Sequence, residues 1–208
     1  MAIGLSIAGR FYVHKRTLTH RHGDHFVGIP VLKKHWPNWD GAWLKFFPGD
    51  QIATPVTIAD PLDTNTFHIG GHALDIVEVG HTDTFDTTVL HVPDLELVVA
   101  GDAVYGDIHQ YFGEVDTTEK RLEWIKAIEK IEALNPKTVV AGRKRPGLVD
   151  GAYYLQSTKE YIKVFEDVVK VSGSDEEIVT QIKSRYPDRV NPHAIMAGAF
   201  AAMKGKQN

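Results

Sequence analysis

Two histidines in the segment THRHGDH, residues 19–25, have the spacing of metal ligands. Imidazole nitrogens and carboxylate oxygens are the donors that zinc accepts where no thiolate is offered, and the chain has no cysteine. A strand that leads into this segment would place His20 and His22 on the same face, because side chains alternate along a strand. The two imidazoles can therefore converge on one ion.

The rest of the segment and two later strand ends supply further donors. Gly23 allows a sharp turn, after which Asp24 and His25 can point back toward the same place. His81 in VGHTDT and Asp102 in AGDAVY each follow a predicted strand, and side chains at strand ends can meet across a sheet. The donors predict a site for one or two adjacent metal ions.

Short runs of β-branched and apolar residues predict the strands that must position these donors. They lie at residues 11–18, 73–79, 87–92, 95–100 and 138–141. Their shortness and apolar character are typical of buried strands.

Three helices are predicted after the strands of the middle region. Asp116 and Glu119 form a capping box for a helix that ends near Leu134, and its apolar side is expected to contain Leu122, Ile125, Ile128 and Ile131. Apolar residues recur at helical spacing over 154–168, and Ser174 with Glu177 caps a third helix. We expect a single α+β domain over residues 1–208, mainly helical after about residue 150.

Composition excludes some partners. The formal charge of the 208 residues is -4 and the basic residues are spread along the chain, so no nucleic-acid or anionic-membrane footprint appears. The first ten residues lack the charged n-region of a secretory signal, and we expect a cytoplasmic protein.

The motifs THRHGDH, GHT at residues 80–82 and GD at 101–102 occur in the order found in the metallo-β-lactamase superfamily, which the chain resembles over about residues 11–145. The resemblance implies an αββα sandwich with a metal site at the edge of two sheets. It also implies the ligands: His20, His22 and His81 for a first zinc, Asp24 and His25 for a second, and Asp102 as the bridge. Iron or manganese are alternative metals.

Such a site would make hydroxide from water near neutral pH and polarise a carbonyl group. We therefore expect a metal-dependent hydrolase that uses a zinc-activated hydroxide on an ester, lactone, thioester or amide of a small molecule. Asp24 is the candidate to orient that water or accept its proton. Tyr105 and His109 are expected to line the substrate pocket, where a tyrosine hydroxyl can stabilise an oxyanion.

Two departures from the family pattern affect these expectations. Arg143 stands in VVAGRKRPG where the family has its last histidine ligand, and a guanidinium cannot bind a cation. Another donor, such as His72 or His109, could complete the second site; otherwise the site is weakened, mononuclear or metal-free. Arg143 could instead pair with Asp24 or Asp102, or bind an anionic substrate group. About eighteen residues precede the histidine turn; part of the first sheet is thus expected to be missing, which favours a homo-oligomer or an altered fold. The alternative function is a catalytically impaired scaffold that binds metal or self-associates without turnover.

Overall fold

The computed structural model describes Gly49 and residues 64–206. The predicted strand at 11–18 and the histidine turn lie outside the described residues, and so does any strand pairing that they make. Of the six ligand candidates, His81 and Asp102 lie within the described residues.

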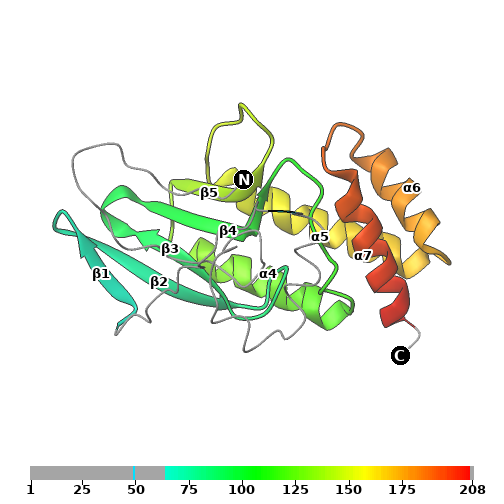
Figure 1. Cartoon of the computed structure of the whole chain (residues 1–208), viewed down its shortest axis with the longest axis horizontal. Helices are drawn as coiled ribbons and strands as arrows, with labels where there is room; N and C mark the ends of the chain where they lie inside the picture. Colours follow the sequence, from blue (N-terminus) through cyan, green and yellow to red (C-terminus); the bar gives the residue numbers. More distant parts are fainter. Residues whose placement is uncertain (1–48, 50–63, 207–208) are drawn as a thin grey trace.

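The described residues form one five-stranded sheet in the order β1-β2-β3-β4-β5, shown in Figure 1. Strands β1 to β4 are antiparallel neighbours, whereas β4 and β5 are parallel. A parallel pair needs a crossover connection, and helix α4 supplies it. The strand bounds are β1 Thr66–Ile69, β2 His72–Gly80, β3 Thr87–Val92, β4 Leu97–Gly106 and β5 Thr138–Lys144. The four strands predicted after residue 72 are confirmed, and β4 runs past its predicted end to Gly106.

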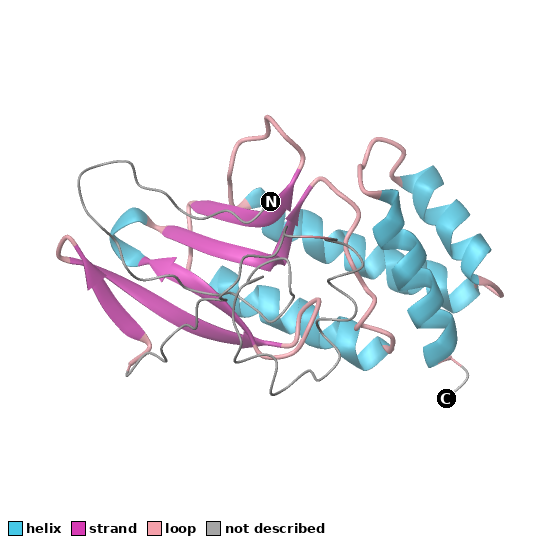
Figure 2. Cartoon of the chain, in the orientation of Figure 1, coloured by secondary structure: helices cyan, strands magenta, loops and turns pink. Residues whose placement is uncertain are grey.

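The helices cover the sheet and extend beyond it (Figure 2). Helix α4, Thr118–Ala133, packs against β2 and β4, and α5, Tyr153–Val171, packs against β4 and β5. Helices α6, Asp175–Arg185, and α7, Pro192–Gly205, pack on each other and on α5. This mixture of sheet and covering helices agrees with the predicted α+β class.

The predicted cap of α4 is wrong by one residue. Thr117, not Asp116, is the N-cap, and its hydroxyl accepts from the backbone N–H of Lys120. The Asp116 carboxylate accepts from the Lys120 ammonium instead, at 2.6 Å. Asp and Thr are both good N-caps, so the sequence DTT does not decide between them. The predicted Ser174 cap of α6 is confirmed, since its hydroxyl accepts from the Glu177 N–H at 3.2 Å.

The predicted buried face of α4 is correct except at its first residue. Ile128 and Ile131 are buried and Ile125 is half-buried, but Leu122 is 50% exposed and its neighbour Arg121 is buried instead. The Arg121 Nε donates to Glu166 of α5 at 2.5 Å, and its Nη1 donates to the Val115 carbonyl at 2.9 Å. A buried charge is tolerated when it is paired and hydrogen-bonded in this way. Arg121 therefore joins α4 to α5 and to the loop that precedes α4.

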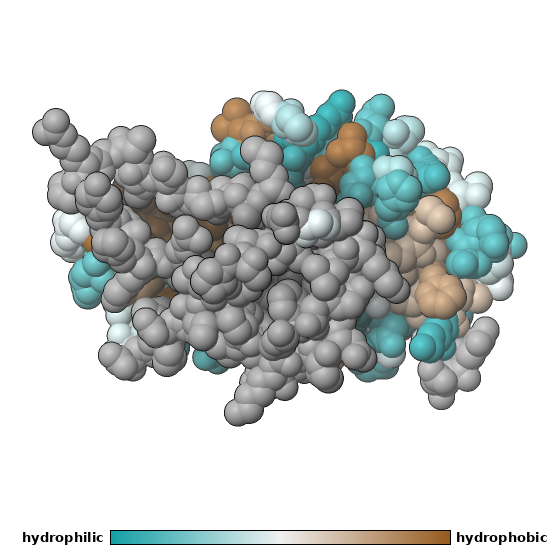
Figure 3. Space-filling view, viewed as in Figure 1, coloured by the Kyte–Doolittle hydropathy of each residue, from teal (hydrophilic) through white to brown (hydrophobic). Residues whose placement is uncertain are grey.

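The surface of the helical end mixes polar and apolar side chains (Figure 3). Met196 and Phe200 of α7 are among the large apolar residues that stay exposed. Of the helices in residues 64–206, none has both the length and the apolar character needed to cross a bilayer.

The Arg121–Glu166 contact predicts an uneven mutational response on α4. Arg121→Ala leaves Glu166 as a buried carboxylate without its main cation, so we expect a loss of about 3 kcal/mol in the free energy of unfolding. The exposed control Leu122→Ala is expected to change it by less than about 0.5 kcal/mol. Urea denaturation of both variants measures the difference, and equal losses would contradict the assignment of Arg121 to the interior.

Candidate functional site

Asp102 lies inside β4, where side chains of two helices form hydrogen bonds with the strand backbone. The Trp124 indole of α4 donates to the carbonyl of Ala103 at 2.9 Å, and the Thr158 hydroxyl of α5 accepts from the N–H of Tyr105 at 3.1 Å. The Asp102 side chain is 1% exposed. The segment that carries the candidate ligand is therefore held by both covering helices, not left as a mobile loop end.

The neighbouring strand β5 approaches Asp102 at a glycine. A Cβ placed on Gly142 would overlap the Asp102 carboxylate, so this position requires glycine. The register between β4 and β5 shifts on either side of Gly101, whose φ is 54°. The bulged strand turns the Asp102 side chain toward the end of β5, where Arg143 follows Gly142.

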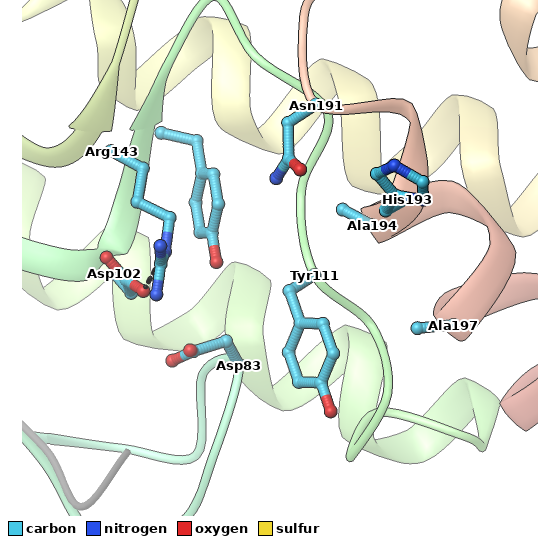
Figure 4. Close-up of a pocket in the computed structure, with 9 residues that line it drawn as sticks. Asp83, Asp102, Tyr111, Arg143, Asn191, His193, Ala194 and Ala197 are labelled. Carbon is cyan, nitrogen blue, oxygen red and sulfur yellow. Dashed lines mark hydrogen bonds and ion pairs between the residues drawn. The ribbon is translucent and has the colours of Figure 1, made fainter. Parts of the chain in front are cut away.

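Arg143 forms an ion pair with this carboxylate. Its Nε donates to Oδ2 of Asp102 at 2.8 Å, as Figure 4 shows with a dashed line. Tyr105 and Arg143 are partners in the β4–β5 register, so the backbone sets the position of the guanidinium. Of the pairings that the sequence left open for Arg143, the one with Asp102 is present.

A pocket of about 260 Å³ opens beside this pair. Its walls come from β4, β5, the loops after β2 and β4, and the start of α7. In Figure 4, Arg143, Asp102 and Asp83 gather on one side, with Tyr111, Asn191 and the start of α7 on the other. The lining residues are Asp83, Asp102, Tyr105, Tyr111, Arg143, Asn191, His193, Ala194 and Ala197. Polar groups of opposite charge thus meet at one concave surface.

Tyr105 supplies a hydrogen-bond donor to this pocket. The side chain is fully buried, and its hydroxyl proton has no acceptor within the described part of the chain. Burial raises the pKa of Tyr105 well above its ordinary value, and the carboxylates of Asp102 and Asp83 raise it further. The hydroxyl therefore keeps its proton at neutral and moderately alkaline pH, and can donate it to a bound oxygen.

His81 is a buried imidazole with no protein partner for either nitrogen among the residues described. Burial lowers the pKa of His81, and the Lys120 ammonium lowers it further, so the ring is neutral at pH 7. Phe85 contacts the ring edge-on, with 4.4 Å between centroids. A neutral imidazole with unused nitrogens is the form that binds a metal ion.

His109 lies outside the pocket lining. Its Nδ1 is 2.8 Å from the Tyr161 hydroxyl, in a cluster that also contains Arg189. Burial, together with the smaller effect of the charge of Arg189, lowers the pKa of His109 to about 4. These contacts explain His109 as a packed residue that joins the loop after β4 to α5.

The six ligand candidates are only partly placed. His20, His22, Asp24 and His25 lie outside the described residues, and within residues 64–206 no three His, Asp or Glu side chains gather as a metal site. His81 is absent from the pocket lining that includes Asp102. The unused nitrogens of His81 fit a metal ion, whereas Asp102 already has Arg143 as its cation.

Sequence reasoning missed the contribution of α7. Asn191, His193, Ala194 and Ala197 line the pocket, but they lie in a different part of the chain from Asp102 and follow no ligand-like spacing. The Asn-Pro pair predicts only that a helix begins there. Packing of α7 against α5 and α6 brings these residues to the site, and no local signal predicts that packing.

Comparison with solved structures shows the fold. A metallo-beta-lactamase family protein from Thermus thermophilus matches with a TM-score of 0.57 at 13% identity, over 92% of this chain and 66% of its own. A beta-lactamase domain protein from Burkholderia ambifaria matches with a TM-score of 0.50 at 15% identity, over 74% of this chain and 48% of its own. A metallo-beta-lactamase from Pontibacter korlensis matches at 20% identity and a TM-score of 0.45, over 70% of this chain and 67% of its own. The chain spans about two thirds of the first of these structures and half of the second.

No curated protein matches the chain. The family model for the metallo-beta-lactamase superfamily matches residues 17–143, the interval that runs from the histidine turn to Arg143. The match covers more than half of the chain and includes every residue proposed as a metal ligand. The chain therefore belongs to the metallo-beta-lactamase superfamily.

Proposed function

We propose that this protein is a metal-dependent hydrolase that cleaves an ester, lactone, thioester or amide of a small molecule. Membership of the superfamily supports metal-dependent hydrolysis in general. The observation that carries the finer proposal is the pocket beside Asp102, where a buried carboxylate, a guanidinium and a protonated tyrosine hydroxyl converge. Fold alone would not name the reaction, because one fold supports many activities.

His81 would hold the metal together with the predicted donors of the histidine turn, His20, His22, Asp24 and His25. Asp102, the predicted bridge to a second ion, is paired with Arg143. Zinc is the proposed metal, with iron or manganese as alternatives, because the donors are imidazole and carboxylate without thiolate. When bound, the ion lowers the pKa of a water and polarises the carbonyl under attack. Asp24 is proposed to orient that water or to take its proton.

The remaining polar groups of the pocket act on the substrate. The Tyr105 hydroxyl is proposed to donate to the oxygen on which negative charge develops, since it is buried and keeps its proton. Arg143 neutralises Asp102 and adds a second hydrogen-bond donor, which is positively charged, at the same wall. The two donors would stabilise the charge that forms when the carbonyl is attacked.

The size of the pocket limits the substrate. Its volume of about 260 Å³ lies just below the range of roughly 300–1,000 Å³ that is usual for pockets of drug-sized ligands. A small ester or lactone fits this volume, whereas a folded protein or a nucleic-acid duplex does not. The α7 residues at its outer wall would contact the part of the substrate that leaves or extends from the reacting bond.

A second candidate function is a scaffold that binds metal or self-associates without turnover. The pairing of Arg143 with Asp102 favours it, because it occupies a carboxylate that the ligand set needs. Exposed Met196 and Phe200 on α7 would suit the proposed homo-oligomer. The two candidates differ in one simple observation, which is whether the protein turns over any generic ester or lactone.

The metal-hydrolase proposal predicts that turnover depends on His81. His81→Ala removes a buried neutral imidazole from the proposed ligand set, so kcat/KM for generic ester or lactone substrates should fall by about 100-fold or more. The control His68→Ala changes an exposed histidine of β1 and is expected to leave turnover unchanged. Hydrolysis that survives in His81→Ala, His20→Ala and Asp24→Ala alike would refute the proposal.

The role of Tyr105 predicts a loss in kcat. Tyr105→Phe removes only the hydroxyl donor, and kcat is expected to fall by about 100-fold with little change in KM. Tyr153→Phe is the matched control, because the Tyr153 hydroxyl bonds the Val149 carbonyl on the exposed side of α5. A pure KM effect in Tyr105→Phe would show that the hydroxyl binds the substrate without stabilising the charge that develops.

The α7 wall predicts a change in substrate size. Ala197→Leu fills part of the pocket, so kcat/KM for a long-chain ester should fall about tenfold more than for the acetyl ester of the same alcohol. Met196→Leu alters the neighbouring exposed residue, outside the pocket lining, and should leave the ratio unchanged. The same loss for all chain lengths would indicate that Ala197 does not touch the substrate.

A further inference from the structure

Arg143 differs from the two basic residues that follow it in the chain. Lys144 pairs with Asp150 at 2.5 Å, and Arg145 lies 3.6 Å from Asp107, both away from the pocket lining. Arg143 instead meets a carboxylate that is 1% exposed, and it lines the pocket. The sequence alone does not distinguish the three basic residues 143–145. In the structure, Arg143 lines the pocket, whereas Lys144 and Arg145 do not.

The backbone fixes this assignment. Gly142 lets β5 come close to Asp102, and Arg143 is the register partner of Tyr105 on β4. Both neighbours of Asp102 in the chain are held, because Gly101 pairs with Ala141 of β5 and the Ala103 carbonyl accepts a hydrogen bond from Trp124. The guanidinium does not reach Asp102 by a chance rotation of a long side chain. It is placed there by the same strand pair that buries the carboxylate.

A buried carboxylate needs a cation, and Arg143 is already that cation. The Arg143 guanidinium stays protonated at every pH that the protein experiences, so its charge remains beside Asp102. It also has no lone pair with which to bind a metal ion. A metal ion that bound the same carboxylate oxygen would lie close to a like charge in a poorly hydrated site, where repulsion is strong. The pair therefore opposes a second ion at Asp102.

We propose that Arg143 replaces a second metal ion at Asp102, so that the chain binds one metal ion and uses the guanidinium as its other fixed positive charge. The inference rests on the proposed function and narrows it to a site with one ion. Neither nitrogen of His81 has a hydrogen-bond partner among the described residues, so one of them is available to the single ion. Asp102 and Arg143 form the charged wall of the pocket.

The test is the number of zinc ions per chain in the full-length protein, equilibrated with excess zinc, freed of loosely held metal and measured by native mass spectrometry and elemental analysis. The wild type is expected to hold one ion. Arg143→His replaces the cation with a neutral metal ligand at the same position. This variant is expected to hold two zinc ions and to bind the second about 10–100-fold more tightly than the wild type does. Arg145→His is the matched control and should stay at one, because Arg145 lies outside the pocket lining.

Each outcome separates this inference from the proposed function. Two ions in the wild type would overturn the inference and leave metal-dependent hydrolysis standing, whereas no ion would overturn the proposed function itself. One ion in a folded Arg143→His protein, checked by circular dichroism, would also overturn the inference. Arg143→Lys keeps a cation beside Asp102 and should hold one ion, so it decides the question if Arg143→His does not fold. Two ions in Arg143→Lys would contradict the role given to the charge.

Discussion

Burying the Asp102 carboxylate inside β4 costs free energy unless a cation and hydrogen bonds replace the lost water, and Arg143 provides both. This pair requires β5 to run parallel and adjacent to β4, with glycine at position 142. The parallel pairing in turn requires the crossover through α4. The interaction at the site and the topology of the sheet therefore depend on each other.

The covering helices serve the site as well as the core. Trp124 of α4 and Thr158 of α5 form hydrogen bonds with the backbone of β4 at Ala103 and Tyr105, within the segment from Asp102 to Tyr105. Arg121 and Glu166 join the two helices to each other, so both hold the strand as one unit. A rigid strand fixes the distance between the carboxylate and the tyrosine hydroxyl, which is what stabilisation of a developing charge requires.

Much of this architecture could be predicted from local sequence signals. Short β-branched runs identified β2, β3, β4 and β5, and the pattern of Ser174 and Glu177 identified the start of α6. The local sequence patterns gave the wrong residue at two positions of α4. Asp116 and Thr117 both make good caps, and Arg121 takes the buried position expected for an apolar neighbour because Glu166 on another helix pairs with it. Pairing across helices is a tertiary property, and no window of the sequence contains it.

Only part of the site could be predicted, because several of its contacts are also tertiary. Asp102 and Tyr105 stand close together on one strand, and their chemistry is visible in the sequence. The pairing of Arg143 with Asp102, and not with another carboxylate, depends on the β4–β5 register. The position of Asn191 and Ala197 at the pocket depends on the packing of α7. His109 shows the converse, since a histidine near the site in sequence is committed to Tyr161 by packing.

A crystal structure of the zinc-loaded protein, with anomalous diffraction at the zinc edge, tests the central claim most directly, because it locates each ion and the guanidinium together. The account predicts one anomalous peak, bound by His81, with Arg143 still within hydrogen-bond distance of Asp102. Two peaks that share the Asp102 carboxylate, with Arg143 turned away from it, would contradict the account.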